Sequence, residues 1–169
     1  MSALLTLLAV IAAFTFTSCG NDDEDEPDPV PTHSEKIGVV YTLNLADAWW
    51  DFFDIEVSYT TIYGKPETKT VTKGWVYAAS LPYDQASAEY SFTAKATPKV
   101  QQPSIDPDAT YALDHGYSCT SYALDKNDGV ENTLYISSPS SKLSARGEKF
   151  TEFAAKSHDL AANSWTIKK

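Results

Sequence analysis

The densest group of side chains that could bind a ligand lies at residues 49–53, where four aromatic residues surround one acid. An exposed aromatic ring can stack on the flat face of a sugar, and a neighbouring carboxylate can accept hydrogen bonds from its hydroxyl groups. Four rings cannot all enter one core from a single turn, so we expect some of them to reach the surface. One interpretation is a glycan-binding platform, and the other is an aromatic plug that buries two or three rings at one end of the domain. The residues of the platform would be Trp49, Trp50, Asp51 and Phe53.

A second group of oxygen-bearing side chains surrounds a glycine, at Asp125, Asn127, Asp128 and Glu131. Carboxylate and amide oxygens are the ligands that Ca²⁺ prefers. The run Asp-Lys-Asn-Asp-Gly is one residue short of the EF-hand spacing, however, and it lacks the distal glutamate. Because Gly129 can adopt a positive φ, the run predicts a tight turn between two strands. We expect no metal site and no cofactor.

The three histidines, His33, His115 and His158, are scattered along the chain. They match neither the H-x-H nor the H-E-x-x-H pattern of zinc sites. Asp114 and His115 precede several serines, which leaves a small Ser/His/Asp hydrolase as a third option, although the chain has no G-x-S-x-G motif. Such a site would need a cleft that holds Asp114 and His115 within hydrogen-bond reach of a serine or a water. We therefore expect no catalytic residue and a protein that is not an enzyme.

The two cysteines have different predicted roles. Residues 3–16 form an almost entirely apolar run that suits a signal peptide and is shorter than the ~20 residues needed to span a bilayer. Thr17, Ser18 and Cys19 follow, and this order of small residues and cysteine resembles the lipobox of secreted bacterial lipoproteins. The resemblance implies cleavage after residue 18 and a membrane anchor formed by lipid attached to Cys19. Cys119 then has no partner, so we expect a buried, unreactive thiol rather than a nucleophile.

An acidic segment follows the first cysteine, with six acids between Asp22 and Asp28. Its charge and its lack of apolar side chains predict a solvated tether rather than a folded element. The segment resembles the export signal that follows the acylated cysteine in surface-exposed lipoproteins of the Bacteroidetes phylum. That resemblance implies attachment to the outer membrane with exposure at the cell surface. We therefore divide the chain into a signal peptide (residues 1–18), an acidic tether (19–36) and one folded domain (37–169).

The folded part is only mildly acidic. The whole chain has a formal net charge of −10, but residues 37–169 hold 16 acids against 12 bases, a net charge of −4. A nucleic-acid-binding domain typically presents a strongly basic surface. The charge distribution therefore argues against a nucleic-acid partner.

The elements that position these residues are predicted to be mostly strands, because apolar side chains recur at every second position. Residues 46–53 break this alternation and predict a helical turn or an aromatic loop. Longer helical spacing appears only late in the chain, where five residues share one helical face. Short strands, frequent turns and no alternation of strands with helices predict an antiparallel, immunoglobulin-like β-sandwich with one short C-terminal helix. The predicted strands are residues 38–45, 54–62, 67–73, 74–79 as a continuation of the strand before it or a new strand, 89–97, 109–124 as one bent strand or two, 130–137 and 163–167. The residues of the predicted helix face are Leu143, Phe150, Phe153, Ala154 and Ser157.

Part of the folded region is also similar to a recurring domain of Bacteroidetes lipoproteins with no assigned activity. The similarity covers residues 54–59, Gly64, Trp75, the pair Leu81 and Pro82, and Lys95. The most direct expectation is a non-catalytic module that binds an extracellular glycan or protein through loops at one end of the sandwich. The alternative is a structural or assembly subunit, which predicts an exposed apolar patch or an open strand edge.

Overall fold

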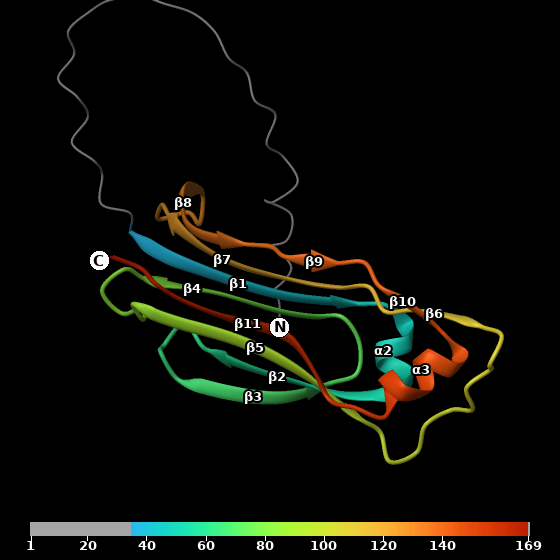
Figure 1. Cartoon of the computed structure of the whole chain (residues 1–169). Coiled ribbons are helices and arrows are strands. Elements are labelled where there is room, and N and C mark those ends of the chain that lie inside the picture. Colours follow the sequence, from blue (N-terminus) through green and yellow to red (C-terminus); the bar gives the residue numbers. More distant parts are fainter. Residues whose placement is uncertain (1–34, 169) are drawn as a thin grey trace, which may run out of the picture.

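The computed structural model describes residues 35–168, which fold as two antiparallel β-sheets packed face to face (Figure 1). The predicted antiparallel β-sandwich is confirmed. The predicted signal peptide, Cys19 and nearly all of the predicted tether lie outside the described residues.

Sheet A has the order β4-β1-β7-β8, and sheet B has the order β11-β5-β2-β3. Sheet A consists of β1 (Lys36–Leu45), β4 (Trp75–Pro82), β7 (His115–Leu124), β8 (Val130–Ser137) and the short β9 (Ser140–Ser141), which also pairs with β7. Sheet B consists of β2 (Phe53–Thr60), β3 (Pro66–Val71), β5 (Glu89–Pro98) and β11 (His158–Thr166).

Aromatic rings from both sheets fill the space between them. Tyr41 of β1 stacks on Phe92 of β5, with 5.7 Å between ring centroids, and meets Trp165 of β11 edge-on at 5.6 Å. The indole N–H of Trp165 donates a hydrogen bond of 2.9 Å to the hydroxyl of Ser121, across the interface between the sheets. The alternation that predicted strand 38–45 is confirmed, because Val39, Tyr41 and Leu43 are all buried on this inner face.

The outer faces of the two sheets differ in charge. On sheet B, Lys95 lies between Glu56 and Asp159 of the neighbouring strands, so this face is polar and charged. The central row across sheet A is uncharged and consists of Ala78, Val40, Thr120 and Ile136.

Two helices and a two-stranded sheet close one end of the sandwich (Figure 1). At this end Phe150 stacks on Tyr111 with 4.1 Å between ring centroids and meets Phe52 edge-on at 4.8 Å. No helix within residues 35–168 is both long and apolar enough to cross a membrane. The elements of this end are α2 (Asp47–Phe52), α3 (Gly147–Ala154), β6 (Thr110–Ala112) and β10 (Ser144–Arg146).

The structure corrects one predicted element, the C-terminal helix, and decides two elements that the sequence left open. The C-terminal helix begins at Gly147 rather than near Leu143, because the backbone of β10 pairs with β6 instead of continuing the helix. Residues 109–124 form two strands, of which β7 belongs to sheet A. The strand that begins at Trp75 does not extend the β2–β3 hairpin but crosses to sheet A, where it pairs with β1.

Candidate functional site

The aromatic segment on α2 is a plug. The side chains of Trp49, Phe52 and Phe53 are only 1%, 3% and 1% exposed. The indole N–H of Trp49 donates a hydrogen bond of 3.1 Å to the carbonyl oxygen of Leu113, so its polar atom is satisfied inside the protein. A buried ring cannot stack on a sugar, and Trp49 and Phe53 are therefore not available as the ligand-binding residues that the sequence predicted.

The other two residues of the predicted platform remain accessible. Trp50 is half-buried, with its indole N–H 3.3 Å from the carbonyl oxygen of Leu45, and Asp51 is exposed. Asp51 lies beside a shallow hollow of about 390 Å³, whereas Trp50 is not among the residues that line it. The lining residues are Ala46, Asp47, Ala48, Asp51, Thr110, Tyr111 and Ala112.

A larger groove of about 560 Å³ adjoins this hollow, and Ala46 lines both. Three segments form the groove: the end of β1, residues 114–118 at the start of β7, and residues 138–142. The third segment reaches this position because Pro139 separates β8 from β9, although both strands pair with β7. The carbonyl oxygen of Pro139 accepts a hydrogen bond of 3.2 Å from the backbone N–H of Tyr117, which fixes the wall of the groove. Its exposed polar side chains are Asn44, Asp114, Ser138, Ser140, Ser141 and Lys142.

Asp114 and His115 both line the groove, but they make separate hydrogen bonds with the backbone. A carboxylate oxygen of Asp114 accepts a hydrogen bond of 3.0 Å from the N–H of Leu143. Nδ1 of His115 lies 3.3 Å from the carbonyl oxygen of Leu113, and the imidazole ring packs edge-on against Trp49. Among the described residues no hydrogen bond links His115 to Asp114 or to a serine. The relay that the hydrolase option requires is therefore not formed in this structure.

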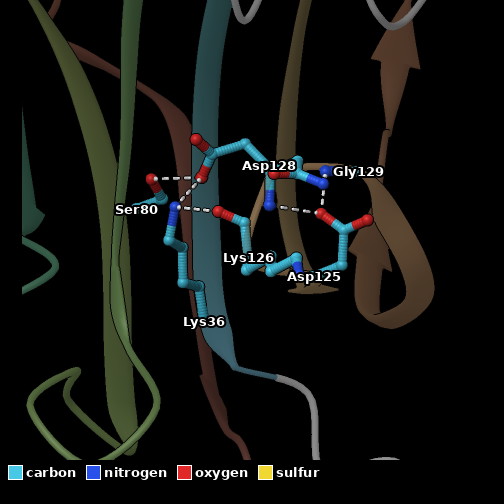
Figure 2. Close-up of polar contacts among 7 residues, drawn as sticks. Lys36, Ser80, Asp125, Lys126, Asp128 and Gly129 are labelled. Carbon is cyan, nitrogen blue, oxygen red and sulfur yellow. Dashed lines mark hydrogen bonds and ion pairs between the residues drawn. The ribbon is translucent and has the colours of Figure 1, made fainter.

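The acidic turn at residues 125–129 joins β7 to β8, as the sequence predicted (Figure 2). The positive φ in this turn belongs to Asp128 rather than to Gly129, where the sequence placed it. One carboxylate oxygen of Asp125 accepts hydrogen bonds from the backbone N–H groups of Asn127 and Gly129, both at 2.7 Å. Asp128 accepts a charged hydrogen bond from the ammonium group of Lys36 at 3.0 Å, and the same ammonium donates to the carbonyl oxygen of Lys126 at 3.0 Å. The ammonium group of Lys36 thus already binds oxygens that a Ca²⁺ ion would need. Within residues 35–168, no group of three or more His, Cys, Asp or Glu side chains could hold a metal ion.

Cys119 is buried on the inner face of sheet A, as predicted, and it is a free thiol. Burial raises its pKa to about 11, although the neighbouring side chain of Asn163 opposes the shift. The reactive thiolate is therefore scarce at neutral pH.

Sequence reasoning did not identify Asn44, Lys142 or the serines of residues 138–141 as site residues. The available signal was a proline inside a serine run at the end of a predicted strand, which indicates a break in an edge strand. Comparisons of this chain with protein-family models, curated proteins and solved structures find no match.

Proposed function

We propose that this chain is a non-catalytic module, anchored to the outer membrane by lipid on Cys19 and exposed at the cell surface, that binds an extracellular glycan. The observation that carries the proposal is the groove of about 560 Å³ beside the end of β1. Its volume is within the usual range of sites for small ligands. The groove would hold one short stretch of a polysaccharide.

The chemistry of the lining supports a sugar as the ligand. The amide of Asn44 both donates and accepts hydrogen bonds, the hydroxyl groups of Ser138 and Ser140 do the same, and the carboxylate of Asp114 accepts them. Sugar hydroxyl groups need this mixture of donors and acceptors. Lys142 is exposed at the same groove and adds a donor that suits a hydroxyl or carboxylate group of an acidic sugar.

The position of the groove supports exposure of the site. Lys36 is the first residue of β1, and Asn44 lies near the other end of this ten-residue strand. At about 3.3 Å per residue, the strand separates these residues by roughly 26 Å. Figure 1 shows the start of β1 at the end of the sandwich opposite α2 and α3. The tether would therefore join the domain at the end far from the groove.

Binding of fluorescent polysaccharides to intact cells that express the full chain tests both parts of the proposal. Asn44→Ala and Lys142→Ala should each weaken binding by about tenfold, the loss expected for about 1.4 kcal/mol of hydrogen bonding. Thr93→Ala, an exposed change on the outer face of sheet B, serves as the matched control and should bind like wild type. Cys19→Ala should abolish labelling of the cells while the purified chain keeps its affinity.

Two results would contradict the proposal that the groove binds the polysaccharide. One is a wild-type chain that binds no polysaccharide from a broad panel. The other is binding that Asn44→Ala and Lys142→Ala leave intact but Trp50→Ala and Asp51→Ala remove, which would place the ligand on the α2 hollow instead.

A further inference from the structure

Within residues 35–168 the sandwich has four edge strands, and three of them carry features that prevent pairing with another strand. Charged side chains, prolines and bulges are the usual protections of an exposed strand edge. β3 begins with Pro66 and contains Glu67 and Lys69. β11 contains Asp159 and has an irregular register after it. β8 contains Glu131, and its register against β7 shifts twice.

The fourth edge strand, β4, has no such protection along its length. Its eight residues include no charged side chain, and its only proline, Pro82, is the last residue. It pairs with β1 without a register shift from Trp75 to Pro82. Within residues 35–168, no backbone hydrogen bond outside the regular strand pairing involves residues 75–81, so the outer edge of β4 is open in the described part of the chain. Val76, on the outer face of the strand, is 49% exposed.

The charges that flank β4 suit a second copy of the same strand. Lys73 lies two positions before Trp75, and Asp84 lies two positions after Pro82; both are exposed. An antiparallel pair of β4 strands brings Lys73 of each copy close to Asp84 of the other. A parallel pair would instead bring like charges together at both ends, which is unfavourable.

We propose that β4 pairs antiparallel with β4 of a second copy, which joins the two A sheets into one continuous sheet. An isologous pair of this kind is closed by a two-fold axis, so it stops at a dimer. Residues that face each other across two strands point to the same side of the sheet. The symmetric pair must therefore centre on a residue that faces the same residue of the second copy. Ala78 lies at the middle of β4 on the outer face of sheet A, and its small side chain allows close approach, so we centre the pair on Ala78. No residue of β4 lines the groove, so the dimer leaves both grooves open.

Cysteine cross-linking of the full chain in membranes tests the pairing. Facing residues of an antiparallel pair have Cα atoms about 4.5–5.5 Å apart, which a disulfide or a short bismaleimide can bridge. Ala78→Cys should therefore yield a cross-linked dimer. Thr68→Cys on the charged edge strand β3 is the matched control and should remain monomeric. The native thiol of Cys119 is buried and does not compete.

A lysine on the same edge should separate the dimer. Val76→Lys, added to Ala78→Cys, should reduce cross-linking by about tenfold, which corresponds to about 1.4 kcal/mol. Val100→Lys makes the same change at a fully exposed loop position and should leave the cross-link intact. Circular dichroism checks that each variant keeps its β-sheet signal.

Three outcomes would overturn the proposal. These are an Ala78→Cys chain that cross-links no more than Thr68→Cys, a cross-link that survives Val76→Lys, and adducts that contain a different protein or form a ladder beyond the dimer. The polysaccharide assay separates this proposal from that of the groove. Val76→Lys should lose the cross-link but retain polysaccharide binding, which would show that β4 forms the dimer contact and not the binding site. Asn44→Ala should lose binding but retain the cross-link, which would show the converse for the groove.

Discussion

The side-chain nitrogen of Lys36 lies 3.0 Å from a carboxylate oxygen of Asp128, a residue 92 positions later in the chain. The pair connects the first residue of β1 to the turn between β7 and β8 (Figure 2). Ser80 of β4 donates to the same carboxylate oxygen at 3.3 Å, so two strands of sheet A and the turn between two others meet at this point. Asp128 has a φ of 65°, which is uncommon for a residue other than glycine, and these contacts hold it there.

Removing this ion pair should lower stability modestly. The two side chains are 27% and 42% exposed, so solvent screens their attraction, and we expect Lys36→Met to cost about 1 kcal/mol or less of the free energy of unfolding. Urea denaturation measures the change, with Lys65→Met at an exposed turn position as the control. Combining Lys36→Met with Asp128→Asn should cost less than the sum of the single changes. Strict additivity would show that the two residues do not interact in solution.

Gly147 begins α3 at a point where no side chain fits. A Cβ atom at this position would overlap the backbone of Asp106 and Pro107, and neither can move as a flexible side chain would. We expect Gly147→Ala to destabilise the fold by about 1–3 kcal/mol, the usual cost of overpacking. Thermal unfolding measures the loss. Gly74→Ala is the matched control, because its Cβ would come no closer than 3.8 Å to the carbonyl oxygen of Leu43. Equal melting temperatures for the two variants would contradict the argument.

Buried tyrosines should make the fold sensitive to alkaline pH. Burial is the main cause that raises the pKa of Tyr90 to about 12, with a smaller contribution from nearby Tyr77, and burial also raises the pKa of Tyr41. An unfolded tyrosine loses its proton near pH 10. Between about pH 10 and 12 the unfolded chain therefore binds fewer protons than the folded one, so stability falls as pH rises.

Urea denaturation at several pH values tests this prediction. Tyr90→Phe should flatten the decline above pH 10, although loss of its 2.8 Å hydrogen bond to the carbonyl oxygen of Ser87 lowers stability at neutral pH. Tyr63→Phe is the control, since the Tyr63 side chain is 65% exposed. An unchanged alkaline slope in Tyr90→Phe would show that this residue does not contribute.

Local patterns were sufficient for much of the fold. Alternation placed Val39, Tyr41 and Leu43 on the inner face of β1, and the run ending in Gly129 predicted the β7–β8 hairpin correctly. The same approach could not assign β4 to sheet A, because its pairing with β1 depends on residues more than thirty positions away. The shortened helix has the same cause. The predicted helical spacing began at Leu143, yet Ser144–Arg146 pair with β6.

The sequence by itself determined the strand-rich class of the domain and the hairpin turn, because each depends on neighbouring residues. The lipid anchor at Cys19 also depends on neighbouring residues, and it stays a prediction. The aromatic segment at residues 49–53 shows where such reasoning ends. Composition allowed either a platform or a plug, and only the tertiary structure decided, because Leu113 and the Phe153 ring of α3 contact Trp49 from segments distant in the chain. The groove beside Asn44 and the open edge of β4 were likewise decided by packing, since each exists only where distant strands meet or end.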